Sequence, residues 1–106
     1  MSGSRITIAD DDRLDNVHPG DILREDFLIG SDISMEEVAL GAGIDVDVLQ
    51  EIVASRRDID PAVDARLTRY FGMSDGFFLR LQVSHDVEEV QRNEAAELDR
   101  IVPRAA

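Results

Sequence analysis

The chain has 106 residues, the size of a single domain, and its lack of cysteine excludes a disulfide framework and a thiolate metal site. It carries 23 acidic residues against 11 arginines and no lysine, for a formal net charge of −12 at pH 7. No apolar run approaches the roughly 20 residues of a membrane span and no secretory signal is visible, so we expect a cytoplasmic protein without a membrane partner. The acidic composition suits a basic protein partner or simply keeps the protein soluble, whereas a nucleic-acid module usually has a basic footprint.

Residues 1–17 form an acidic lead-in with three successive aspartates, and we expect them to be a tail. This tail either stays disordered or adds a strand to a partner's sheet. The main domain should then span residues 18–102, with a short tail at 103–106 that begins with a proline. Within the domain, the apolar residues of 21–29 are spaced for one face of a first helix.

The stretch from Ser34 to Arg57 predicts two helices joined by a tight turn. Ser34 and Glu37 have the spacing of a capping box, which begins the first of these helices. Gly43 is well placed for the left-handed conformation of the turn, and Asp45 can cap the second helix. The stretch therefore has the outline of a helix-turn-helix.

Two further helices are predicted after this stretch. Asp60 is an N-cap followed by Pro61 at the first helical position, and Gly72 should end that helix. Ser74 opens the next helix, which we expect to continue as far as Arg100. No region alternates for long enough to build a sheet core, so the prediction is an all-α fold of five helices.

The chain offers little for catalysis or metal binding. Its only histidines, His18 and His85, have no cysteine, serine or further histidine at a useful spacing. The aspartates at 10–12 lack the alternating ligands and the glycine of a calcium loop, and no glycine-rich phosphate loop occurs. We therefore predict no enzyme, no cofactor and no metal.

Five motifs resemble those of one known family, in the same order and with matching spacing. They are HPGDIL (18–23) against HPGEIL, LQEIVASRR (49–57) against INEIVNGKR, ARLTRYFGMS (65–74) against ALRLARYFGTS, FFLRLQ (77–82) against FWLNLQ, and the segment near 85–87 against NYDL. This family is the HigA-type antitoxins, a branch of the lambda-repressor-like (XRE) helix-turn-helix class. The resemblance covers residues 18–92, which is most of the chain.

The resemblance implies a five-helix DNA-binding fold, a homodimer and a toxin partner of the HigB type, a small basic ribonuclease that cleaves mRNA. It further implies that the protein neutralises this toxin and represses its own operon by binding double-stranded operator DNA. Two alternatives keep the same fold. One is a protein-interaction module whose DNA binding is weakened or lost, and the other is a stand-alone transcriptional regulator.

The last long helix carries two features relevant to partners. Its apolar residues Leu81, Val83, Val87 and Val90 are candidates for a dimer seam. Its acidic face is either a solvated surface or a docking surface for the basic toxin.

The resemblance places the DNA contacts in the helix-turn-helix, whose second helix presents its N-terminal residues to base edges. The candidates are Ser34, Asp45, Val46, Asp47, Gln50, Arg56 and Arg57. Asp45 and Asp47 favour the positive end of the helix dipole but oppose a phosphate there. A carboxylate can nevertheless accept a hydrogen bond from cytosine N4. Arg56 and Arg57 either contact the DNA backbone or form salt bridges with nearby carboxylates.

Overall fold

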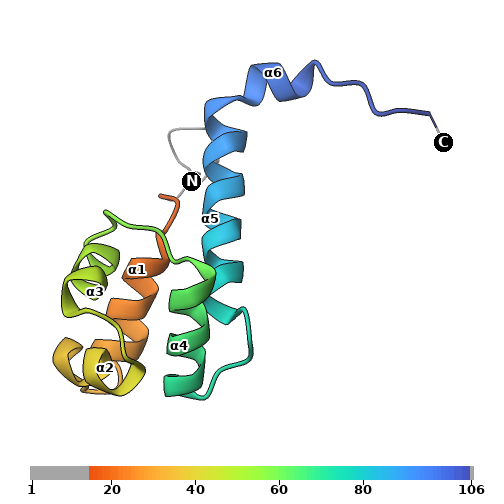
Figure 1. Ribbon diagram of the computed structural model, residues 1–106. Helices are drawn as coiled ribbons and strands as arrows, with labels where there is room; N and C mark the ends of the chain where they lie inside the picture. The colour runs from red at the N-terminus through yellow and green to blue at the C-terminus, as the bar shows by residue number, and fades with distance from the viewer. Residues whose placement is uncertain (1–14, 106) are drawn as a thin grey trace, which may run out of the picture.

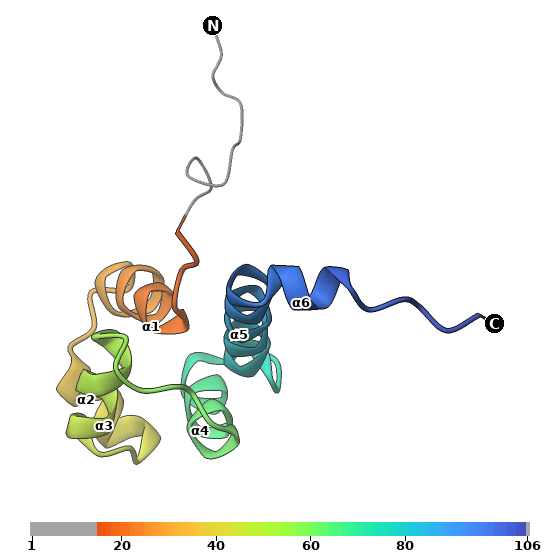
Figure 2. The ribbon, with the colours of Figure 1, turned by 90° about the horizontal axis from the view of Figure 1, so that it is seen from above.

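The structure is a computed structural model that describes residues 15–105. Across this range the chain forms helices and no strand, which confirms the all-α prediction. The elements are α1 (Pro19–Ile22), the π-helix η2 (Leu23–Ile29), α2 (Met35–Ala42), α3 (Val46–Val53), α4 (Pro61–Phe71), α5 (Phe77–Asn93) and α6 (Ala95–Asp99). Helices α1 to α4 gather beside one half of α5, and α6 projects away from them (Figures 1 and 2).

Most helix ends follow the local signals in the sequence. Ser34 Oγ accepts a hydrogen bond from the Glu37 backbone N–H at 3.0 Å, and the Glu37 carboxylate accepts one from the Ser34 N–H at 3.0 Å. The predicted capping box is therefore confirmed. Gly43 and Gly72 end α2 and α4 in the left-handed conformation, each with a φ of 69°. The Asp60 side chain caps α4 through a first-turn amide at 2.9 Å.

The beginning of α5 differs from the prediction. The helix begins at Phe77 and not at Ser74, because Gly76 takes a left-handed φ of 81° and provides no side-chain cap. Asp64 of α4, only 4% exposed, supplies the missing acceptor. Its carboxylate accepts hydrogen bonds from the backbone N–H groups of Gly76 at 2.9 Å, Phe78 at 2.9 Å and Leu79 at 3.1 Å. A side chain from the preceding helix thus caps α5.

One other helix prediction was wrong, and the first predicted helix consists of two types of helix. The last long helix does not reach Arg100, because Glu94 leaves the helical region with φ −121° and ψ 25°, and α6 is a separate short helix. The first helix changes after one turn into η2, where the Gly30 N–H donates to the Glu25 carbonyl, five residues earlier, at 2.9 Å. The predicted number of five helices is therefore too low.

The hydrophobic core lies between α1–η2, α2, α3, α4 and the first turns of α5. Its largest fully buried apolar side chains are Phe78, Leu23, Leu49, Ile52, Leu67 and Val38. Each such side chain contributes about 1.5–3 kcal/mol through its removal from water. Phe27 of η2 stacks on Phe71 and Phe78 with ring centroids 4.9 and 5.1 Å apart, which joins the first helical segment to α4 and α5.

Helix α1 approaches α3 most closely at Gly20. A Cβ atom on Gly20 would lie 1.8 Å from the carbonyl oxygen of Ile52, so only glycine fits without a shift of backbone. The Gly20 N–H also donates to His18 Nδ1 at 2.9 Å, which caps α1. The seating of α3 against the first helix therefore depends on the absence of a side chain here.

We expect Gly20→Ala to lower the free energy of unfolding by about 2–3 kcal/mol, because the methyl group forces α1 away from α3. Helix propensity alone predicts the opposite, a gain of roughly 0.5–1 kcal/mol. Urea unfolding followed by circular dichroism measures the difference. Gly72→Ala is the control, because its Cβ meets open space and only its positive φ should cost about 1 kcal/mol. A neutral or stabilising Gly20→Ala would contradict the close contact.

Candidate nucleic-acid interface

Helices α2 and α3 form the predicted helix-turn-helix. Val38 and Ala42 of α2 and Leu49 of α3 point into the common core, while Ile44 in the turn is buried as well. Arg66 of α4 donates to the carbonyl of Ala42 at 3.3 Å and so satisfies one acceptor at the end of α2. Figures 1 and 2 both show α2 and α3 together on the side of the molecule opposite α6.

The first turn of α3 exposes the candidate base-contacting residues. Asp45, Asp47 and Gln50 are exposed, and Val46 is half-buried beside them. These four predicted residues therefore lie at the N-cap and in the first half of α3 or just beyond it, and three of them are exposed. Val48, by contrast, packs against the core.

Asp45 does not act as predicted. It occupies the N-cap position of α3, but its side chain makes no capping hydrogen bond. Only its carbonyl oxygen takes part, accepting from Val48 N–H at 3.1 Å and Leu49 N–H at 3.2 Å. The Asp45 carboxylate therefore stays exposed to solvent, and the amides at this helix end lack a side-chain cap.

Ser34 lies at the beginning of α2, where its hydroxyl oxygen is occupied by the capping bond from Glu37. The hydroxyl proton is still able to donate, because the cap uses Ser34 Oγ only as an acceptor. The carboxylates of Glu36 and Glu37 are exposed at the same helix end. A phosphate at this position would therefore meet the Ser34 hydroxyl and the first amides of α2, but also two negative charges.

The two candidate arginines have different surroundings. Arg57 Nε donates to Glu51 Oε1 at 2.7 Å, so the salt-bridge alternative describes Arg57. Arg56 is exposed, and its guanidinium forms no ion pair with any residue of 15–105. Both follow Ser55, whose left-handed φ of 62° bends the chain sharply at the end of α3. Arg56 is thus the cation of this surface that is available to a phosphate.

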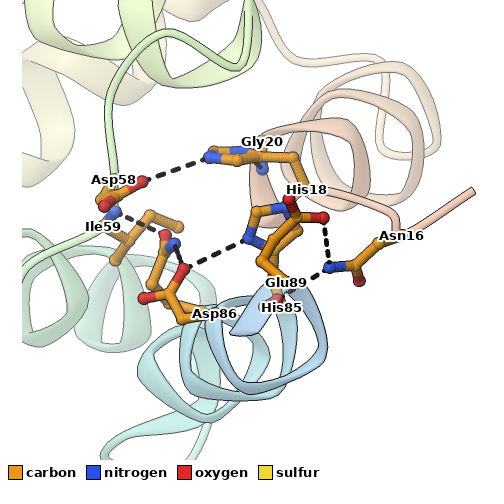
Figure 3. A network of polar contacts seen from close by, with 9 residues as sticks. Asn16, His18, Gly20, Asp58, Ile59, His85, Asp86 and Glu89 are labelled. Carbon is orange, nitrogen blue, oxygen red and sulfur yellow. Dashed lines mark hydrogen bonds and ion pairs between the residues drawn. The ribbon is translucent and has the colours of Figure 1, made fainter. Parts of the chain in front are cut away.

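The loop that carries these arginines is anchored from α5. Ile59 is buried, and its backbone N–H donates to the Gln82 side-chain oxygen at 2.8 Å. Asp58 Oδ1 lies 3.6 Å from His18 Nε2, and Figure 3 shows the two side chains facing each other. Sequence analysis did not identify Gln82 as relevant, although it closes the FFLRLQ motif. A glutamine on the inward face of an otherwise apolar helix stripe was the available signal.

Within residues 15–105 no cluster of three or more histidine or acidic side chains could hold a metal ion. No helix in the same range is long and apolar enough to cross a membrane.

No protein-family model matches the sequence. The chain is 30% identical over 87 residues to "Virulence-associated protein I" of Dichelobacter nodosus, a match that covers 82% of this chain and 80% of that protein. Among solved structures it is similar to PA4674 of Pseudomonas aeruginosa in complex with its 18-bp operator DNA. The TM-score is 0.80 and the sequence identity is 31%, and the match covers 85% of this chain and 96% of PA4674. It is also similar to the Pseudomonas aeruginosa antitoxin HigA with the higBA promoter, with a TM-score of 0.77, 29% identity, and coverage of 86% and 100%.

The chain belongs to the HigA-type antitoxin family. The resemblance found in the motifs is therefore confirmed, together with the helix-turn-helix fold class. A HigA-type antitoxin is a regulatory protein and not an enzyme. In this member of the family the carboxylates of Asp45 and Asp47 are exposed at the beginning of α3.

The two helix caps of the HigA-type domain should differ in their contribution to stability. We expect Ser34→Ala to lower the free energy of unfolding by about 1–2 kcal/mol, because it removes a capping hydrogen bond. Asp45→Ala should lower it by no more than about 0.5 kcal/mol, because only the interaction of the charge with the helix dipole is lost. Chemical unfolding of both variants tests this difference. Equal losses would mean that Asp45 caps α3 in solution.

Proposed function

We propose that the protein is the antitoxin of a type II toxin–antitoxin module and that it represses its own operon by binding operator DNA through α3. The observation that carries the proposal is the similarity to operator-bound PA4674 over almost the whole of that chain. A second neighbour is described with promoter DNA. The exposed face of α3 supports the same role, since helix-turn-helix proteins read the major groove with this helix.

The proposed DNA contacts are of two kinds, to base edges and to the phosphate backbone. Asp45 and Asp47 face base edges and accept hydrogen bonds from cytosine amino groups, while Gln50 pairs with an adenine edge. Val46 offers its methyl groups to a thymine methyl. Arg56 contacts a phosphate, because it is exposed at the end of α3 and has no ion pair among the described residues.

Ser34 and Arg57 provide secondary backbone contacts. Ser34 donates its hydroxyl proton to a phosphate while it continues to cap α2. Arg57 is held at Nε by Glu51, which leaves its terminal nitrogens to face the same DNA strand. With few cations at this surface and a net charge of −12, binding should be weak and should require low salt.

A homodimer is proposed for the DNA-binding species. Val83, Val87 and Val90 lie along one face of α5 and are 57%, 47% and 44% exposed. Such a stripe of exposed valines at helical spacing suits pairing with a second copy. Leu81 does not belong to the stripe, because it packs against the core of its own chain. Two-fold symmetry would match a palindromic operator.

We expect the protein to retard its own promoter in a mobility-shift assay at low salt. Arg56→Ala should weaken binding on all sequences and reduce the slope of log affinity against log salt by about 1, because one phosphate contact is lost. Asp47→Ala should strengthen binding or relax its sequence preference, because a negative charge is removed. Arg100→Ala near α6 is the charge-matched control and should leave the slope unchanged. Absence of a shift, with or without the toxin, would exclude the repressor function.

The proposed toxin partner is a basic ribonuclease of the HigB type. The acidic residues Glu97 and Asp99 of α6 are exposed, and no ion pair joins them to any described residue. In α5, by contrast, Glu88 pairs with Arg92 and Glu89 accepts a hydrogen bond from Asn16. The free carboxylates of α6 are therefore better suited to attract a basic partner.

The double variant Glu97→Lys with Asp99→Lys should bind the toxin several-fold more weakly, because it reverses the charge that attracts the partner. The measurement is titration of toxin ribonuclease activity with the antitoxin, using the small basic protein encoded beside it. Asp26→Lys with Asp75→Lys makes the same change in net charge at two other exposed positions. If both double variants inhibit the toxin as well as the natural chain does, α6 is not the docking surface.

A protein-interaction module without operator binding is the second candidate function. It is favoured by one observation, the concentration of negative charge at α3, where Asp45 and Asp47 are exposed and Arg57 is already paired with Glu51. In that case the protein would neutralise the toxin and leave its promoter unbound. The mobility-shift assay distinguishes the two functions.

A further inference from the structure

The loop between α3 and α4, residues 54–60, is held in a specific shape. It begins with the left-handed bend at Ser55 and ends with Ile59, which is 2% exposed and packs into the core. Between these two fixed points lie Arg56 and Arg57, whose side chains are exposed. The direction in which the two guanidinium groups point therefore depends on how the end of the loop is anchored.

Gln82 of α5 is the main anchor of this loop. It is only 4% exposed, and both ends of its amide are used. The side-chain oxygen accepts from the Ile59 N–H at 2.8 Å, and Nε2 donates to Asp86 Oδ1 at 3.0 Å. A buried N–H without a partner is costly, so the Ile59 amide and the Gln82 side chain stay together.

His18 provides a second link between the loop and the rest of the molecule. Its Nδ1 accepts from the Gly20 N–H, so the ring proton is on Nε2, which lies 3.6 Å from Asp58 Oδ1. The ring also packs edge-on against His85 of α5, with centroids 5.1 Å apart. His85 Nδ1 in turn lies 3.2 Å from Asp86, the residue that holds Gln82.

Asn16 connects the chain before α1 to the same network. Its Nδ2 donates to the His85 carbonyl at 2.7 Å and to Glu89 Oε2 at 3.0 Å. Figure 3 shows the result, in which Asn16, His85, Asp58 and Ile59 come together from three separate parts of the sequence. One network of polar contacts therefore joins the loop of residues 54–60, α5 and the residues that directly precede α1.

We propose that Gln82 is a positioning residue for the DNA-contacting loop, and that Asn16 supports it through its hydrogen bonds to His85 and Glu89. The inference rests on the proposed DNA binding, because Arg56 is taken as the phosphate contact. Neither Gln82 nor His18 touches DNA in this scheme.

Gln82→Leu tests the positioning, because it removes both hydrogen bonds and keeps a similar volume. We expect it to weaken operator binding about fivefold, the equivalent of one hydrogen bond. In this background Arg56→Ala should no longer change the salt slope, because a misplaced Arg56 has already lost its phosphate. Asn16→Ala should weaken binding about two- to threefold through the same network.

Thr68→Val is the matched control for general destabilisation. Thr68 is also buried and polar, but its hydroxyl bonds only to the Ala65 carbonyl in its own helix. Thr68→Val should lower the free energy of unfolding and leave both the affinity for operator DNA and the effect of Arg56→Ala unchanged. If the effects of Gln82→Leu and Arg56→Ala on affinity are simply additive, the positioning role is overturned.

If the natural chain does not bind its promoter, the positioning role can still be tested in the protein without DNA. Such a result would remove the proposed repressor function without deciding the positioning. Amide hydrogen exchange should then be faster at Ile59, Arg57 and Arg56 in the Gln82→Leu and Asn16→Ala variants than in Thr68→Val. Unchanged exchange at these amides would overturn the inference.

Discussion

The arrangement of this domain depends on one buried carboxylate, Asp64 of α4. Helix α5 begins after a left-handed glycine and has no cap of its own, so its first N–H groups require an acceptor from elsewhere. Asp64 accepts three of them and fixes the start of α5 against α4. The helix is then directed so that Gln82 reaches Ile59 and His85 reaches His18. A contact between two helices outside the helix-turn-helix thus determines what holds the arginine loop.

The exposed carboxylates at the start of α3 stabilise the helix but repel a DNA phosphate. Each carboxylate in the first turn stabilises the helix by about 0.3–1 kcal/mol through the helix dipole. A phosphate near the same end would be repelled by Asp45 and Asp47, and the Arg57 charge is partly neutralised by Glu51. The same charges that stabilise the start of α3 therefore weaken its attraction for a phosphate. Salt screens both effects at exposed groups, so the balance depends on ionic strength.

The parts of the fold that sequence analysis predicted correctly have local causes. Ser34 with Glu37, and Gly72 at the end of α4, act within a few residues along the chain, and their spacing alone identifies them. The contacts from Asp64 and Gln82 span 12 to 23 residues, so no local pattern reveals them. Asp45 was predicted as a cap from its residue type, but its side chain makes no capping hydrogen bond.

The two faces of α5 carry different kinds of contact. The outer face carries Val83, Val87 and Val90, which are exposed and suited to a second copy, whereas Gln82 and His85 on the other side hold the loop and the entry to α1. One helix therefore carries both the exposed valine face and the anchor of the loop with Arg56 and Arg57, and no side chain belongs to both.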